Sequence, residues 1–332
     1  MPGIGETLHG GPVDHDEVQR VRDSLLFEGP DLRRRLIRFA VLLALSTAIA
    51  TYGLIGDAVA TIIGAMIVAP LMVPIMGLAF GISIGERKAV VSSLLVGLGG
   101  IATSILVGYL LALPFSHTLD PTQVPQIMSR TQPQLVDLLA ALATGLAGAF
   151  AVSRRDVSDT LPGVAIAISL VPPLANVGIL LAVGRPNLAA GSMLLFVTNY
   201  LAIIVTGSFV FGLMGFSRVA FSRQSPRTRR AGMALAIGLT AVLIVPLTAT
   251  SYNVAVAQLV KSRAVAATES WLAGTQYRVV SADTSQRVQV VVSGTGALPS
   301  VAALEQKLHG RLFGHSLTIE TLPASLTVVP TR

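Results

Sequence analysis

Long blocks of apolar residues, separated by short polar connections, dominate the chain. A helix that crosses a membrane needs about 20 mostly apolar residues, and the chain has seven such blocks. Their interiors contain no Lys, Arg, Asp or Glu. The charged residues Arg38, Asp137 and Asp159 fall within the blocks but lie at their ends. We therefore predict seven membrane helices, at Leu36–Leu54, Ala58–Ile84, Ala89–Leu113, Gln134–Val152, Asp159–Val183, Leu188–Gly215 and Ala231–Thr250.

The basic residues gather in every second connection. These connections carry Arg20, Arg22, Arg33, Arg34, Arg35, Arg87, Lys88, Arg154, Arg155, Arg218, Arg223, Arg227, Arg229 and Arg230. The connections on the other side carry Arg130 and Arg185. Because basic loops tend to stay in the cytoplasm, residues 1–35 are expected to form a cytoplasmic segment of a bacterial inner-membrane protein. An odd number of spans then places residues 251–332 outside the cytoplasm.

The composition supports this interpretation and excludes several others. Hydrophobic residues make up 52% of the 332 residues and charged residues 12%, against roughly 25% charged in soluble proteins. The formal net charge of +7 would suit nucleic acid, but its positive residues follow the topology, so we expect no nucleic-acid partner. The basic clusters are suited to anionic membrane lipid. The absence of cysteine excludes disulfides and thiol chemistry.

The two ends of the chain differ from the apolar middle. Residues 16–27 place Val18, Val21, Leu25 and Leu26 on one helical face, which is typical either of a surface helix or of a lead-in to the first span. Residues 251–332 predict a small α+β domain. The expected order is a helix at 252–273, strands at 277–281 and 288–293, a helix after Pro299, and strands at 317–322 and 326–329.

A shift of 99 residues aligns the chain with itself without a gap. The aligned pairs include Asp57 with Asp156, Gly64 with Gly163, Leu71 with Leu170, Pro74 with Pro173, Gly85 with Gly184, Ser93 with Ser192 and Gly108 with Gly207. Apolar sequences also match by chance, so the alignment alone leaves both explanations open. If it is a repeat, its units are residues 36–113 and 134–215, with 231–250 as a seventh helix. A unit of three spans ends opposite to where it began, so the second copy would be inverted, as in many transporters.

Proline interrupts two of the repeated spans near their middle. Pro70 and Pro74 lie in the second span, and Pro172 and Pro173 lie in the fifth. Proline removes a helix hydrogen bond, and in lipid the freed carbonyl must find a partner inside the protein or in a watery cavity. The prolines therefore predict either breaks that form a solute site or kinks that are only structural.

Further candidate site residues surround these breaks. Asn176, Thr198 and Asn199 lie at mid-depth, where a buried amide needs hydrogen-bond partners. They are candidates for solute contacts or for bonds between helices. Gly64 and Gly163 have no Cβ, so we expect backbones to approach closely there. The sequence predicts no catalytic constellation, no metal site and no cofactor.

Three signatures resemble the bacterial multi-pass membrane family called domain of unknown function 389. They are Ile63–Met66 with Pro70–Met72 and Pro74–Ile75, Leu161–Ala167 with Leu170–Ala175 and Gly178, and Gly191 with Leu194–Phe196 and Thr198–Asn199. Asn176 departs from the pattern, which has a small residue there. The resemblance covers roughly residues 40–215 and implies a multi-pass inner-membrane protein, without a substrate or a catalytic residue.

Two functions from different classes fit these observations. The first is a transporter or channel for a small neutral or anionic solute, since intramembrane carboxylates for proton or sodium coupling are absent. The second is a membrane sensor or assembly scaffold whose external domain binds a ligand or other subunits. A hydrated path between the second, fifth and sixth spans distinguishes the first from the second. We expect no enzymatic activity. Gly97, Gly99, Gly100 and Gly108 in the third span suggest close helix contacts in a homo-oligomer.

Overall fold

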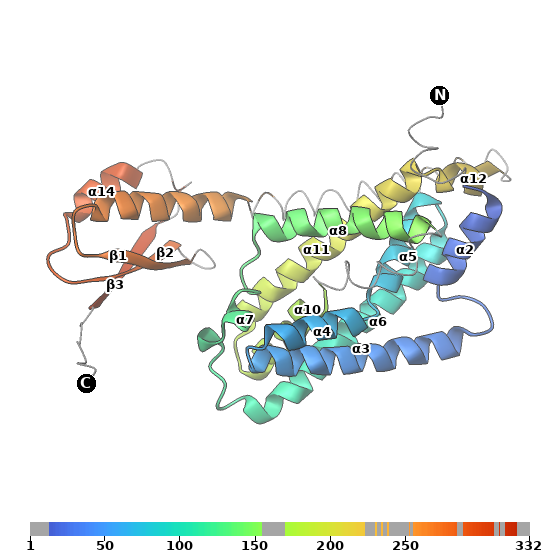
Figure 1. Ribbon diagram of the computed structural model, residues 1–332, viewed down its shortest axis with the longest axis horizontal. Helices are drawn as coiled ribbons and strands as arrows, with labels where there is room; N and C mark the ends of the chain where they lie inside the picture. The colour runs from blue at the N-terminus through green and yellow to red at the C-terminus, as the bar shows by residue number, and fades with distance from the viewer. Residues whose placement is uncertain are drawn as a thin grey trace, which may run out of the picture. The chain divides into compact units, whose positions relative to one another are not determined.

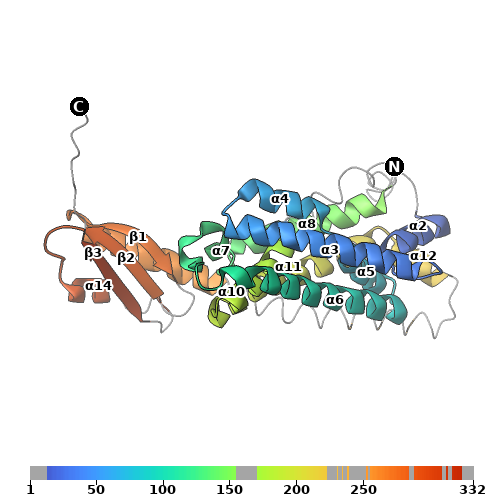
Figure 2. The same ribbon diagram turned by 90° about the horizontal axis from the view of Figure 1, so that it is seen from below.

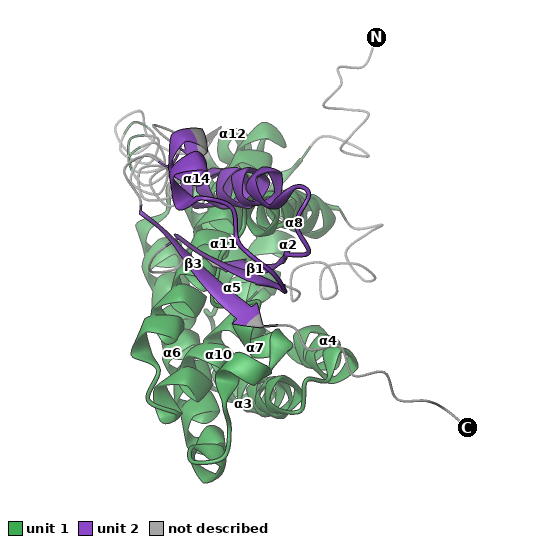
Figure 3. Ribbon diagram, turned by 90° about the vertical axis from the view of Figure 1, so that its left-hand side faces the viewer, with its two compact units in different colours: residues 1–251 green, residues 252–332 purple. Residues whose placement is uncertain are grey.

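The computed structural model describes residues 13–154, 170–222, 255–283, 288–308 and 316–323, with single positions at 230, 234, 238, 252 and 312. The chain divides into two compact units, Met1–Ser251 and Tyr252–Arg332 (Figure 3). Each unit has its own hydrophobic core, so the two are described separately.

The described part of the first unit is helical (Figures 1 and 2). Its elements are α2 (His15–Leu25), α3 (Leu32–Ile55), α4 (Val59–Val68), α5 (Met72–Ser83), α6 (Arg87–Ala112), η1 (Leu113–Phe115), η2 (Pro121–Gln123), α7 (Pro125–Met128), α8 (Leu135–Ser153), α10 (Val171–Ala182), α11 (Pro186–Leu213) and α12 (Phe216–Ser222).

Among the described residues, four helices are long and apolar enough to cross a membrane: α3, α6 with η1, α8 and α11. Helices α4 and α5 together form a fifth candidate, bent by 51° at their junction. This confirms a helical bundle with several apolar spans. The predicted fifth span is described only through α10, which has 12 residues. The predicted seventh span, 231–250, lies almost wholly outside the described residues, so the count of seven stays a prediction.

The glycines of α6 turn out to pack within the chain. A Cβ at Gly100 would lie 2.9 Å from Leu71 Cδ2, and one at Gly108 would lie 2.8 Å from the Ala175 carbonyl oxygen. A Cβ at Gly97 would lie 3.2 Å from the Tyr200 hydroxyl oxygen, whereas one at Gly99 would meet no atom within 4 Å. Gly97, Gly100 and Gly108 therefore serve contacts inside the bundle and do not themselves support the predicted homo-oligomer, which stays a prediction.

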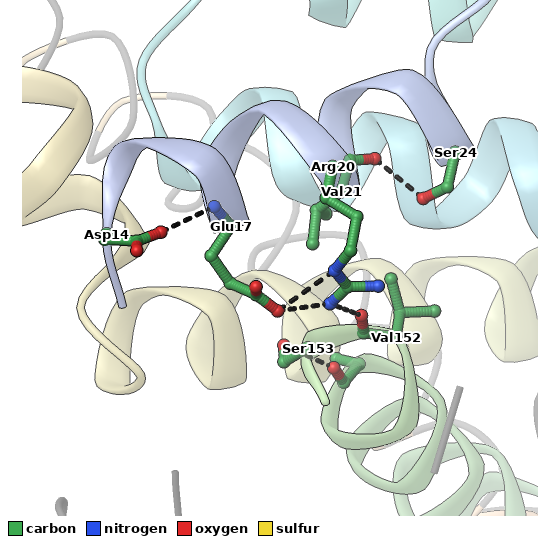
Figure 4. A network of polar contacts seen from close by, with 8 residues as sticks. Asp14, Glu17, Arg20, Val21, Ser24, Val152 and Ser153 are labelled. Atoms are coloured by element: carbon green, nitrogen blue, oxygen red, sulfur yellow. Dashed lines mark hydrogen bonds and ion pairs between the residues drawn. The ribbon is translucent and has the colours of Figure 1, made fainter. Parts of the chain in front are cut away.

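Helix α2 packs against the bundle instead of lying free on a surface. Its apolar face buries Val21 and Leu25, and it contacts α5, α8 and α12. Polar contacts fix its start (Figure 4): the Asp14 carboxylate accepts a hydrogen bond from Glu17 N, while Arg20 binds the Glu17 carboxylate and the Val152 carbonyl at the end of α8. The helix is thus held to the same core as the apolar spans.

The second unit is the small α+β structure expected from the sequence. A helix at 255–272 is followed by β1 (Arg278–Asp283), β2 (Val288–Gly294), α14 (Val301–Leu308) and β3 (Leu317–Pro323). Strand β2 pairs antiparallel with β1 and parallel with β3. Alternate residues of β2 face a core that includes Trp271 and Leu304. The strand predicted at 326–329 lies outside the described residues.

Candidate functional site

The break between α4 and α5 centres on Pro70. Helix α4 stops because Ala69 is extended, with φ −67° and ψ 124°, a conformation that a following proline favours. Pro74 lies in the first turn of α5, where the missing N–H of a proline costs little. The predicted interruption is therefore present, but Pro74 begins the second half-helix and does not break it.

Pro172 and Pro173 have the same role in the second half of the chain. Both lie in the first turn of α10, and α10 is buried from Val171 to Leu180. They therefore lie at the start of α10. Residues 155–169, including Gly163, lie outside the described residues. At Gly64, a Cβ would meet no atom within 4 Å, so the described residues do not provide the close backbone approach expected there.

The helix bounds reproduce the 99-residue shift. Helices α5 and α10 begin at Met72 and Val171, and α6 and α11 begin at Arg87 and Pro186. Both half-helices also end in the same turn. Gly85 has φ 63° and Gly184 has φ 72°, a left-handed conformation that glycine adopts at little cost.

The hydrogen bonds of these two turns match as well. Glu86 N donates to the Gly81 carbonyl at 3.0 Å, and Arg185 N donates to the Leu180 carbonyl at 2.8 Å. This pattern, with a left-handed glycine, is a Schellman helix end. Both half-helices therefore return into the next helix through the same structure.

Each half-helix packs on the long helix of the other half of the chain. In α6, a Cβ at Gly108 would lie 2.8 Å from the Ala175 carbonyl oxygen of α10. In α11, a Cβ at Gly207 would lie 3.5 Å from Met76 Sδ of α5. Gly108 and Gly207 are 99 residues apart, and Met76 and Ala175 are also 99 residues apart. Two contacts exchanged in this way are what a two-fold relation produces, because the rotation that carries one half onto the other also carries it back.

Asn176 is fully buried and joins three elements. Its Nδ2 donates to the Ile127 carbonyl of α7 at 3.0 Å and to Ser192 Oγ of α11 at 2.8 Å. Its Oδ1 has no hydrogen-bond partner among the described residues. The amide thus holds α7 and α11 to α10 and leaves one acceptor unused.

Thr198 and Asn199 lie near the middle of α11, at 2% and 3% exposure. Thr198 Oγ1 and Asn199 Oδ1 have no partner within the described ranges. A shift of 99 residues relates Asn199 to Gly100, and a Cβ at Gly100 would lie 2.9 Å from Leu71 Cδ2 at the α4–α5 break. Asn199 therefore occupies the position that, in the first half, touches the break.

Two further buried hydroxyls were missed from the sequence. Ser93 Oγ on α6 and the Tyr200 hydroxyl on α11 are buried without a partner in the described part of the chain. Each hydroxyl faces a glycine: Cβ atoms at Gly77 and Gly97 would lie 2.7 Å from Ser93 Oγ and 3.2 Å from the Tyr200 hydroxyl oxygen. The signal was present as a polar residue within an apolar span. The described core between α5, α6, α10 and α11 thus contains neutral polar atoms with unused hydrogen-bonding capacity.

Comparison with known proteins gives a family for this core and no activity. Residues 66–205 match the family described as Domain of unknown function (DUF389). The chain is 28% identical over 216 residues to the uncharacterized protein MJ0678 of Methanocaldococcus jannaschii, a match covering 64% of this chain and 66% of that protein. The chain therefore spans just under two thirds of that relative, which is archaeal, so the similarity extends beyond bacteria. The resemblance drawn from the three signatures is confirmed by this match of residues 66–205 to the DUF389 family.

Proposed function

We propose that the protein is a membrane transporter or channel for a small neutral or anionic solute. Its pathway runs between two inverted repeats, 36–113 and 134–215, followed by a seventh helix at 231–250 and an extracytoplasmic domain at 251–332. The observation that carries the proposal is the exchanged packing of the half-helices, α5 on α11 and α10 on α6. Inverted repeats that meet through broken helices are the usual architecture of secondary transporters.

The directions of the two half-helices support the inversion. The end of α5 lies beside α2, since Arg22 binds Glu86 just after α5. The end of α10 lies near the α7 segment, because Gly191, in the second turn of α11, packs on the Thr131 carbonyl oxygen. Helices α2 and α7 lie at opposite ends of the bundle in both ribbon views (Figures 1 and 2). The two half-helices therefore end at opposite ends of the bundle.

The chemistry around the breaks indicates the solute class. Helix N-termini carry a partial positive charge and free N–H groups, which favour anions. Thr198 and Asn199 add neutral polar atoms, and the apolar spans have no carboxylate at mid-depth for proton coupling. A neutral or anionic solute suits these groups, and the proposal assigns no catalytic chemistry to the chain.

The absence of cysteine permits a direct test of a hydrated path. A single Thr198→Cys variant in membrane vesicles should react with the small, charged reagent methanethiosulfonate ethylsulfonate. Ile67→Cys is the matched control, because Ile67 is 53% exposed on the apolar surface and a thiol in lipid does not react with a charged reagent.

A flux assay on proteoliposomes complements the labelling. Swelling in iso-osmotic glycerol or urea tests neutral solutes, and swelling in potassium nitrate with valinomycin tests an anion. If Thr198→Cys stays unreactive and the liposomes do not swell in any of these solutes, the pathway is rejected, and the sensor or scaffold function becomes the better explanation.

A further inference from the structure

Each repeat is preceded by a short helix with the same spacing. Helix α3 begins at Leu32, seven residues after α2 ends at Leu25. Helix α8 begins at Leu135, seven residues after α7 ends at Met128. We name residues 21–28 the α2 cap and residues 121–131 the α7 cap. The two caps therefore end at the same distance before the first long helix of each half, although these bounds are shifted by 103 residues and not by 99.

Both caps are seated on the same position of a half-helix. In α5, a Cβ at Gly77 would lie 2.7 Å from Ser93 Oγ and 3.0 Å from the Leu25 carbonyl oxygen of the α2 cap. The equivalent position in α10, 99 residues later, is Asn176. Its amide binds Ser192, the equivalent of Ser93, and the Ile127 carbonyl of the α7 cap. In each repeat, a backbone carbonyl of the cap thus lies against the half-helix and a serine of the long helix.

The two caps lie at opposite ends of the bundle. The α2 cap leads directly into the start of α3. The α7 cap lies just beyond the end of α3, because Gln126 N donates to Asp57 Oδ1 at 3.1 Å. The 24 residues of α3 span roughly 36 Å at 1.5 Å per residue, which is more than the hydrocarbon thickness of a bilayer.

Different interactions hold the two caps. Arg22 of the α2 cap binds both carboxylate oxygens of Glu86, at 2.6 and 2.7 Å, and Glu28 at 2.9 Å. The hydrogen bonds that Arg22 donates to the Glu86 carboxylate raise the pKa of Arg22. These groups are partly exposed, so water can compete for them. The α7 cap is held by the Asn176 amide and by Ile127, which is fully buried.

We propose that the α2 cap and the α7 cap are the two gates of the solute pathway, one at each end, and that they open alternately. This inference rests on the proposed function. The caps are coupled because each is seated on a half-helix that packs on the long helix of the other repeat, through Gly108 and Gly207. A tilt that frees one cap therefore presses the opposite half-helix onto the other.

The test measures the reaction rate of Thr198→Cys with methanethiosulfonate ethylsulfonate from each side of sealed vesicles. Asp23→Cys and Thr118→Cys, both exposed, identify the α2 side and the α7 side. Arg22→Ala should raise the rate from the α2 side roughly threefold to tenfold, the range expected for a partly exposed, bidentate charged pair, and lower it from the α7 side. Asn176→Ala should have the opposite effect.

Matched controls separate gating from general loosening. Gln19→Ala and Thr122→Ala remove exposed side chains whose hydrogen bonds stay within their own turns, to Asp23 and Asp120, so neither should change the rates. If Arg22→Ala fails to give a monodisperse protein, the exchanged pair Arg22→Glu with Glu86→Arg is tested, and it should restore the rate of the parent.

The outcomes distinguish this inference from the proposed function. If Thr198→Cys reacts but its rates are unchanged by either cap variant, or rise from both sides at once, the gates are wrong and the pathway stands. Reaction of Leu71→Cys at the break provides a second reporter with the same expectations. If neither reporter reacts in any background, the proposed function itself fails.

Discussion

The close crossing of α6 and α10 can be tested by adding one methyl group at Gly178. A Cβ at Gly178 would lie 2.5 Å from both the Ile105 carbonyl oxygen and Tyr109 N. Both atoms are backbone, so no side chain can rotate away, and α10 must move by about 0.9 Å to reach an ordinary van der Waals contact of 3.4 Å. The residue equivalent to Gly178 in the first repeat is Ala79. The contact of α10 with α6 therefore lacks a methyl group that the contact of α5 with α11 has. We expect Gly178→Ala to destabilise the bundle.

The magnitude follows from two opposing terms. Overpacking a close contact costs roughly 1–3 kcal/mol, and backbone obstacles place this site at the upper end. Replacing glycine by alanine inside a helix returns about 1 kcal/mol. The net loss is about 1–2 kcal/mol, or a fall in Tm of roughly 2–8 °C for a chain of this size. Gly99→Ala is the matched control in α6, because its Cβ would meet nothing within 4 Å, so its Tm should stay or rise.

The assay must report on the first unit. The single tryptophan is Trp271 in the second unit, and cysteine is absent, so tryptophan emission and thiol dyes are unsuitable. Detergent-solubilised protein with a fluorescent tag is heated in steps, and the monodisperse fraction is measured by size exclusion. If Gly178→Ala melts at or above Gly99→Ala, the close crossing of α6 and α10 is refuted.

Three further predictions address the turns, the second unit and the topology. Gly85→Ala and Gly184→Ala each force a left-handed alanine and should each cost roughly 1–2 kcal/mol, measured in the same heating assay; a loss at only one of them would contradict the equivalence of the turns. Val290→Asp places an unpaired carboxylate in the second core, where Val290 is fully buried, and should shift the emission of Trp271 to longer wavelength, whereas Val280→Asp, at a position 59% exposed, should not. In intact cells an impermeant thiol reagent should label Val280→Cys and Thr118→Cys but not Asp23→Cys, and the reverse pattern would overturn the predicted orientation.

The elements that were predictable are those whose signal is local. Long apolar blocks specify α3, α6, α8 and α11, because a membrane helix satisfies its own backbone hydrogen bonds. The break at Pro70 follows from one residue that cannot continue a helix. The alternation of Val288, Val290 and Val292 predicted the buried face of β2. Each of these conclusions needs only the sequence around the residue concerned.

The contacts were not predictable, because they depend on which faces meet. A glycine in an apolar helix signals close packing without naming the partner, so Gly97, Gly100 and Gly108 suggested a neighbouring subunit when their partners lie in the same chain. Asn176 was recognised as buried and polar, but its bond to Ile127 links positions 49 residues apart. Helix α7 was missed because it is one turn long. The helical face at residues 16–27 was predicted, but its packing against α5 was not.

The two repeats share a backbone plan but differ in polarity at two equivalent positions. Gly77 and Gly100 of the first repeat correspond to Asn176 and Asn199 of the second. In the first repeat, the space of a side chain is taken by the Leu25 carbonyl and by Leu71. In the second, each position supplies an amide with an unused acceptor among the described residues. A symmetric pair of half-helices would bind a solute equally in two opposed orientations. Under the proposed function, the two amides on the second repeat make these two orientations unequal.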